Sequence, residues 1–131
     1  MDARGTTTVD DLLREARDGL ERLDPASARA AVAGGAILID IRAESQRDRD
    51  GRVPGARFVA RNALEWRLDP ASEHRDPELA RRDVPVILMC DEGFQSSLAA
   101  ATLQRLGVRA TDMVGGFQAW RSAGLPVEQD A

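Results

Sequence analysis

The fold of this chain is decided by one stretch of its sequence, Val86-Ile87-Leu88-Met89-Cys90-Asp91-Glu92-Gly93-Phe94-Gln95-Ser96-Ser97. Its first four residues form an apolar run that is too short for a helix and is typical of a strand covered on both faces. A short loop containing a glycine follows, and from Ser96 to Leu106 the apolar side chains recur at helical spacing. The stretch therefore predicts a buried strand, a tight loop and a helix, in that order.

The rest of the chain alternates in the same way. A first helix is expected from Thr6, with Thr8 as its cap and Gly19 near its end, followed by an extended segment at 20–23. Further helices are expected at 25–33, 43–49, 61–68 and 117–123, and further strands at 36–41, 57–60 and 111–114. Trp66 is expected to pack in the core. Strands that alternate with helices predict a parallel sheet covered on both faces, with ligands bound beyond the carboxyl ends of its strands.

Composition narrows the class of protein. The chain has 131 residues, of which 43% are hydrophobic and 31% charged, as expected for one globular domain. All 18 basic residues are arginine, yet the net charge is -4, so tight binding to nucleic acid is disfavoured. No apolar run approaches the roughly 18 to 20 residues that cross a membrane, and the first residues do not resemble a signal peptide. We therefore expect a cytoplasmic protein that binds neither nucleic acid nor membrane.

The single cysteine and the single histidine carry opposite expectations. One cysteine excludes an internal disulfide, and His74 alone argues against a zinc site. Cys90, however, stands between a strand, a glycine loop and a helix N-terminus, where backbone N–H groups and the helix dipole favour an anion. Such surroundings stabilise a thiolate and favour a nucleophile. The alternative interpretation is a small buried side chain at a strand end.

Four further segments form a pattern with this loop: Ile39-Asp40-Ile41-Arg42, Gly51-Arg52-Val53-Pro54-Gly55-Ala56, Gly115-Gly116-Phe117-Gln118-Ala119-Trp120 and Ala123-Gly124-Leu125-Pro126-Val127. In these segments the chain resembles the rhodanese-like (sulfurtransferase) domain family. Together with Cys90 and Gly93 they occur in the family's order and spacing. The resemblance implies an α/β fold of three layers, α/β/α, with a small, mostly parallel five-stranded sheet. It divides the chain into a helical extension at 1–19, a domain at 20–128 and a tail at 129–131.

The resemblance also implies a reaction. The Cys90 thiolate would take the outer sulfur of a donor as a persulfide and pass it to cyanide or another thiol, with no cofactor. The loop residues Asp91, Glu92, Gly93, Phe94, Gln95 and Ser96 would hold the persulfide through their backbone N–H groups. Asp40 and Arg42 are expected to support the fold, as are Gly115, Gly116 and Trp120.

The sequence departs from the family pattern in the loop. Gln95 stands where many catalytic members carry an arginine, and both Asp91 and Glu92 are acidic. Each pair of like charges about 4 Å apart costs roughly 1 kcal/mol even in water, so thiosulfate is expected to be a poor donor. A donor with less negative charge, including a protein persulfide, fits better. Compensation by an arginine before the loop, Arg61 or Arg67, is a further expectation.

Two alternatives belong to other functional classes. The first is a rhodanese-like module that binds a partner without catalysis, which the acidic loop favours and the cysteine disfavours. The second is a phosphatase or arsenate reductase of related fold, which requires an arginine closing the loop to bind phosphate oxygens. Because no arginine lies between Cys90 and Arg105, the second is disfavoured.

Overall fold

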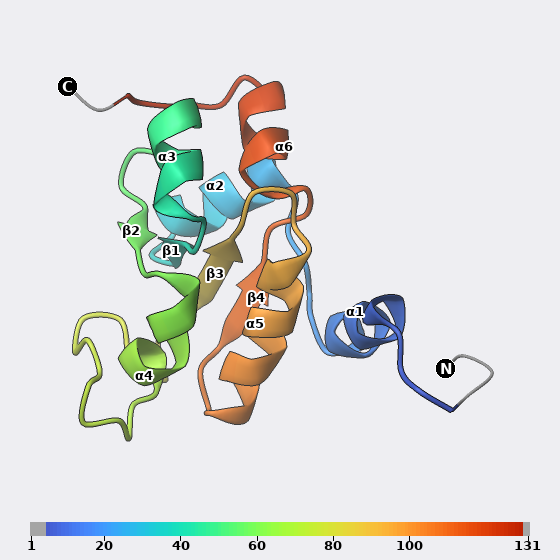
Figure 1. Cartoon of the computed structure of the whole chain (residues 1–131). Helices are drawn as coiled ribbons and strands as arrows, with labels where there is room; N and C mark the ends of the chain where they lie inside the picture. Colours follow the sequence, from blue (N-terminus) through green and yellow to red (C-terminus); the bar gives the residue numbers. More distant parts are fainter. Residues whose placement is uncertain (1–4, 130–131) are drawn as a thin grey trace.

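A computed structural model describes residues 5–129 of the chain (Figure 1). The helices are α1 (Val9–Asp18), α2 (Pro25–Ala33), α3 (Glu44–Asp50), the short 3-10 helix η1 (Arg61–Ala63), α4 (Leu64–Leu68), α5 (Gln95–Arg105) and α6 (Gly116–Ser122). The strands are β1 (Ile37–Asp40), β2 (Arg57–Phe58), β3 (Val86–Met89) and β4 (Ala110–Asp112). The elements alternate as the sequence predicts, and the predicted α/β class is confirmed.

The sheet is parallel throughout, with strand order β2-β1-β3-β4. In its register Asp40 lies beside Met89 and Leu88 beside Asp112, so the carboxyl ends of three strands meet at one edge. The sheet has four strands, and the prediction of five is wrong in this detail. The expected fifth segment makes only a single parallel bridge, from Leu23 to Met113. A longer strand is prevented because Asp24 already caps α2 and Pro25 begins it.

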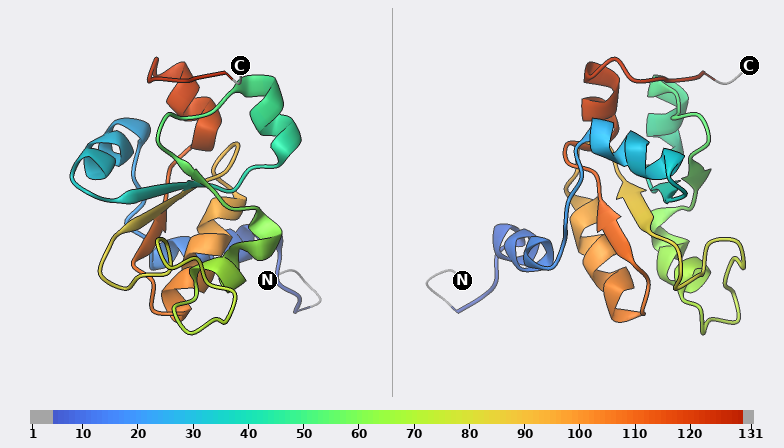
Figure 2. Two further views of the ribbon diagram at one scale, coloured as in Figure 1. Left: turned by 90° about the vertical axis from the view of Figure 1, so that its left-hand side faces the viewer. Right: turned by 180° about the vertical axis from the view of Figure 1, so that it is seen from behind.

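Helices lie on both faces of the sheet (Figure 2), and a hydrophobic cluster fills the space on each face. On one face, Ile39 and Leu88 pack with side chains of α4 and α5. On the other face, Leu38 and Ile87 pack with Ala28 of α2 and with α6. Neighbouring residues of a strand point to opposite faces, and this alternation separates the two clusters. The result is the predicted three-layer arrangement.

The first helix lies outside this sandwich, packed on α5 (Figure 1). The predicted cap is present: the Asp11 backbone N–H donates to the Thr8 hydroxyl at 3.1 Å, and the Thr8 N–H donates to the Asp11 carboxylate at 3.0 Å. The helix ends at Gly19. Of the proposed extension at 1–19 and tail at 129–131, residues 1–4 and 130–131 lie outside the described residues. The proposed division of the chain stays a prediction.

Trp66 does not pack in the core, contrary to expectation. Its side chain is exposed, whereas Leu64 and Leu68 of the same helix are fully buried. Residues four apart lie on one face of a helix, and the residue midway between them lies on the other. Leu64 and Leu68 already cover the sheet, so Trp66 faces outward.

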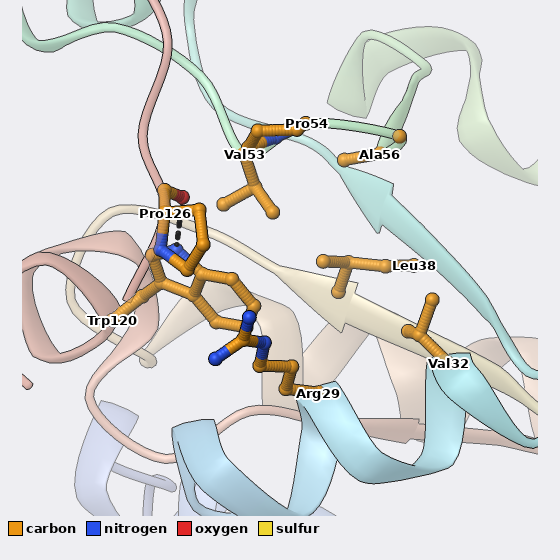
Figure 3. Close-up of a pocket in the computed structure, with 9 residues that line it drawn as sticks. Arg29, Val32, Leu38, Val53, Pro54, Ala56, Trp120 and Pro126 are labelled. Atoms are coloured by element: carbon orange, nitrogen blue, oxygen red, sulfur yellow. Dashed lines mark hydrogen bonds between the residues drawn. The ribbon is translucent and has the colours of Figure 1, made fainter. Parts of the chain in front are cut away.

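An apolar cavity of about 230 Å³ lies on the α2 and α6 face (Figure 3). Leu38, Val53 and the indole of Trp120 form its walls, and Arg29 lies at its edge. The Trp120 indole N–H donates to the carbonyl oxygen of Pro126 at 2.8 Å, which ties the C-terminal segment to α6. Cys90 belongs to the cluster on the opposite face of the sheet. The cavity is therefore separate from the cysteine site.

Candidate functional site

Cys90 is the first residue after β3, at the carboxyl edge of the sheet. It is almost completely buried. It nevertheless borders a surface cavity of about 300 Å³, lined also by Gln46, Asp91, Glu92, Phe94 and Gln95. Four predicted loop residues thus meet the cysteine at one open hollow.

The loop after Cys90 turns back on the sulfur. The Gly93 backbone N–H donates to Cys90 Sγ, at 3.1 Å. Gly93 has φ +88°, a conformation that favours glycine, and a Cβ atom there would lie 2.7 Å from the Gly115 nitrogen. Both the turn and the close approach therefore require glycine at this position. The N–H bond to sulfur is of the kind that stabilises an anion on Sγ.

The start of α6 holds the base of the loop. The backbone N–H of Phe117 donates to the Cys90 carbonyl at 2.9 Å, and that of Gln118 donates to the Asp91 carbonyl at 3.1 Å. Gly116 allows this approach, because a Cβ atom there would lie 2.7 Å from the Asp91 carbonyl carbon. The glycine pair Gly115-Gly116 is thus packed directly against the cysteine loop.

A buried polar network lies behind the cysteine. The hydroxyls of Ser96 and Ser97 donate to the Asp112 carboxylate at 2.7 and 2.8 Å, and Arg22 Nε donates to it at 2.8 Å. Asp112 is fully buried, so the arginine and the hydroxyls supply the partners that a buried carboxylate needs. Cys90 Sγ lies 3.3 Å from Ser96 Oγ. Because the Ser96 hydroxyl donates to Asp112, its oxygen is the acceptor for a Cys90 S–H.

Two arginines bind the loop from outside the predicted site. Arg17 Nη2 and Arg22 Nη2 donate to the Gly93 carbonyl oxygen at 2.9 and 3.0 Å. Arg17 Nε also donates to Ser97 Oγ at 3.0 Å. Sequence reasoning missed both arginines and Asp112. One signal was available for Asp112, since it ends a strand beside β3 and so lies at the same sheet edge as Cys90.

The open side of the site is acidic. Asp91 accepts a hydrogen bond from Gln118 Nε2 at 2.9 Å, and the same nitrogen donates to Asp50 at 3.0 Å. The pKa of Asp50 is held well below its ordinary value, chiefly by the hydrogen bond from Arg49, so a second carboxylate near the loop is charged. Glu92 is exposed. Among the described residues that line the cavity, none is basic.

The exposed aromatic side chain of the loop is Phe94. It is 55% exposed at the mouth of the cavity, next to the two loop carboxylates. A ligand or partner that covered this side chain would gain free energy from burying its apolar surface. The opening to Cys90 therefore combines negative charge with an apolar contact.

The other predicted residues lie at different distances from this opening. Arg61 pairs with Glu65 at 2.8 Å and borders an adjoining hollow of about 350 Å³ that also includes Gln95. Arg67 instead donates to the carbonyl oxygen of His74, in the segment after α4. Of the two arginines expected to compensate for Gln95, only Arg61 is therefore brought near the loop.

Asp40 and Arg42 form a buried pair below the site. Arg42 Nη2 donates to Asp40 Oδ2 and to the Gly51 carbonyl, both at 2.8 Å, and its guanidinium lies over the Phe117 ring at 3.8 Å. The pair thereby joins the end of β1 to the turn before β2 and to α6. Neither residue lines the cavity beside Cys90.

The fold and the cysteine loop define a protein class. The family model of the rhodanese-like domain matches residues 24–123, and the chain belongs to this family. Thiosulfate sulfurtransferase GlpE of Ectopseudomonas mendocina is 32% identical over 103 residues, covering 78% of this chain and 85% of that protein. GlpE of Vibrio cholerae is 44% identical over 80 residues, covering 60% of this chain and 76% of that protein.

A solved structure covers nearly the whole chain. It is a protein of unknown function, possible tyrosine phosphatase, from Rhodopseudomonas palustris, and it is 35% identical with a TM-score of 0.86. The match covers 98% of this chain and 99% of that one. The rhodanese-like family model begins after Arg17 and Arg22, whereas this structural likeness extends over almost the full chain. Within residues 5–129, no helix is both long and apolar enough to span a membrane.

Proposed function

We propose that this protein is a sulfurtransferase that carries sulfane sulfur as a persulfide on Cys90. The Cys90 thiolate attacks the outer sulfur of a donor, a new S–S bond forms, and the donor's own S–S bond breaks. The electron pair leaves with the donor thiolate, which takes up a proton. An acceptor thiolate then attacks the outer sulfur of the Cys90 persulfide, and the Cys90 thiolate is released unchanged. The two steps require no external oxidant or reductant.

The observation that carries this proposal is the geometry around Sγ. Cys90 lines an open cavity and its sulfur accepts the Gly93 N–H at 3.1 Å, in a loop of a sulfurtransferase family. Aligned backbone donors of this kind stabilise negative charge that moves onto the outer sulfur, without reorganising during the reaction. A cysteine that served only for packing would need neither the open cavity nor the donor.

The charge at the opening supports a donor other than a small dianion. Asp91 and Glu92 border the cavity, and no described lining residue offsets them with a positive charge. Both carboxylates repel thiosulfate by roughly 1 kcal/mol each at contact distance in water. A protein persulfide with basic residues around its cysteine would gain from the same charges and would cover Phe94. We therefore propose a persulfide, either of a small thiol or of a protein, as donor and a thiol as acceptor.

A non-catalytic binding module is the second candidate, favoured by the exposed Phe94 that lines the same cavity as Asp91 and Glu92. It differs from the first in predicting that Cys90 takes up no sulfur. Phosphatase activity is not supported, although one structural relative is described as a possible tyrosine phosphatase. Phosphate requires donors to three oxygens, and the segment from Cys90 to Gln104 contains no arginine.

The donor preference is tested by comparing thiosulfate with the hydropersulfide of an uncharged thiol. We expect the double variant Asp91→Asn/Glu92→Gln to raise kcat/KM for thiosulfate about ten-fold, which corresponds to roughly 1.4 kcal/mol. We expect a much smaller change with the hydropersulfide. Glu73→Gln, in the exposed segment after α4, is the matched control. Equal changes for both donors, or none, would contradict the electrostatic argument.

A further inference from the structure

The geometry points to Arg17 and Arg22 as positioning residues for the persulfide loop, contributed by the segment that precedes the residues matched by the family model. This inference rests on the proposed function. The two arginines share one acceptor, the Gly93 carbonyl oxygen, at 2.9 and 3.0 Å. The Gly93 N–H, in the preceding peptide, donates to Cys90 Sγ at 3.1 Å. The arginines therefore bind the peptide unit that follows the N–H donor to the reacting sulfur.

The orientation of that peptide decides where the next N–H group points. A trans peptide is planar, and its C=O and N–H point in opposite directions. With the Gly93 carbonyl held by the arginines, the Phe94 N–H is directed away from them. Gly93 has φ +88° and Phe94 is right-handed, with φ -94° and ψ -67°. Consecutive residues of opposite hand form a nest, whose N–H groups face one concave side. The Phe94 N–H thus shares the side of the Gly93 N–H, where the sulfur lies.

The arginines also strengthen this donor. Hydrogen bonds from a charged donor are roughly twice as strong as neutral ones, and chains of hydrogen bonds polarise one another. Two guanidinium groups on one carbonyl draw electron density from its peptide, which makes the Phe94 N–H a better donor. Within residues 5–129, the structure gives the Phe94 N–H no protein acceptor. It remains available for the outer sulfur of a persulfide.

Each arginine also binds a second group of the protein, which fixes its guanidinium and therefore the position of the Gly93 carbonyl. Arg22 binds the fully buried Asp112 with two nitrogens, at 2.8 and 3.2 Å. Arg17 Nε donates to Ser97 Oγ, which itself donates to Asp112. The planar guanidinium of Arg17 thus bridges the loop and the start of α5, and that of Arg22 bridges the loop and the end of β4. Arg17 reaches this position because α1 packs along α5. This contact gives the first helix a role at the site.

Arg17 is the better residue to test, since removing Arg22 would leave Asp112 buried with its charge unpaired. The test compares Arg17→Met, which keeps an apolar side chain of similar length, with Arg14→Met on the same helix. Arg14 is largely exposed and pairs with Asp11. We expect Arg17→Met to slow persulfide formation from a saturating hydropersulfide roughly ten- to hundred-fold, with little change in the half-saturating concentration. Arg14→Met should leave both unchanged.

Two further measurements separate positioning from charge and from stability. Arg17→Lys keeps the charge, but one ammonium cannot bridge Ser97 and Gly93 as a fork does, so we expect only partial recovery. Full recovery by lysine would show that charge alone acts and would overturn the inference. So would a rate for Arg17→Met equal to that of Arg14→Met. Thermal unfolding must show that Arg17→Met remains folded at the assay temperature.

The inference is tested separately from the proposed function by alkylation of Cys90 with iodoacetamide at one fixed pH. This reaction uses the thiolate and needs no sulfur donor. We expect Arg17→Met to slow it about threefold relative to Arg14→Met, the size of one weakened dipole contact to an anion. A wild-type chain that alkylates but accepts no sulfur refutes the proposed function. An equal alkylation rate in the two methionine variants refutes the positioning role.

Discussion

The contact between Gly116 and the cysteine loop gives a prediction whose size follows from the structure. In Gly116→Ala the added Cβ would lie 2.7 Å from both the carbonyl carbon and the carbonyl oxygen of Asp91. Ordinary contact begins near 3.5 Å, so loop and helix must separate by roughly 1 Å. That movement breaks the hydrogen bonds from Phe117 and Gln118 to the loop, each worth about 1 kcal/mol. Alanine at φ +60° adds strain of about 1 kcal/mol.

Gly124→Ala is the matched control. Gly124 has φ +75°, and a Cβ there would meet nothing within 4 Å. This variant therefore has the backbone strain without the contact. The free energy of unfolding should fall by about 3 kcal/mol in Gly116→Ala and by about 1 kcal/mol in Gly124→Ala.

The assay is denaturant unfolding followed by tryptophan fluorescence, with sulfur uptake by Cys90 measured on the same samples. With a urea m-value of about 2 kcal/mol/M, a difference of about 2 kcal/mol shifts the unfolding midpoint by roughly 1 M. Gly116→Ala should also lose most sulfur uptake, because the loop that faces Sγ moves. Equal losses of stability in the two variants, with sulfur uptake intact in both, would refute the argument that Gly116 holds the loop.

Three further predictions concern the groups around the loop. Asp112→Asn should lower the free energy of unfolding by about 3 kcal/mol, because Arg22 loses its buried counter-charge; an unchanged midpoint in urea would contradict this. The hydrogen bond from Arg49 lowers the pKa of Asp50 in the folded protein, so the charged carboxylate stabilises the fold. This stabilisation is complete above the unfolded pKa of about 4 and is lost as the pH falls through the folded pKa. The stability advantage of wild type over Asp50→Asn should accordingly shrink below about pH 4 in urea titrations, and an advantage that grows there would show the sign to be wrong. Phe94→Ser should slow sulfur uptake from a protein persulfide more than from a small hydropersulfide, and equal effects in stopped-flow mixing would argue against docking through this side chain.

Local patterns predict most of the fold. The apolar runs at β1 and β3, the Thr8 cap and the glycines that end helices are each decided by neighbouring residues. The strand, loop and helix around Cys90 are predicted for the same reason. The prediction of a fifth strand is wrong because the segment before α2 makes only one bridge, from Leu23 to Met113. The prediction that Trp66 is buried is wrong because an apolar side chain alone does not show which face of a short helix packs against the sheet.

The polar network behind the cysteine could not be predicted in the same way. Arg17 and Gly93 are 76 residues apart in the chain, and Arg22 and Asp112 are 90 apart. Among 18 arginines, nothing local distinguishes these two from solvated ones. The position of Arg17 depends on how α1 packs against α5, and that of Arg22 depends on the segment before α2 lying beside the end of β4, both of which are tertiary properties. The sequence thus indicates the candidate nucleophile, while the groups proposed to orient its loop are found only in the structure.

The central claim, a persulfide on Cys90, is tested most directly by intact mass. The reduced protein and its Cys90→Ser variant are each treated with the hydropersulfide of an uncharged thiol, and their masses are measured before and after cyanide. The proposal predicts that wild type gains the mass of one sulfur atom, that cyanide removes it, and that the serine variant gains nothing. A wild-type mass that stays unchanged, or a gain that persists in Cys90→Ser, would contradict it.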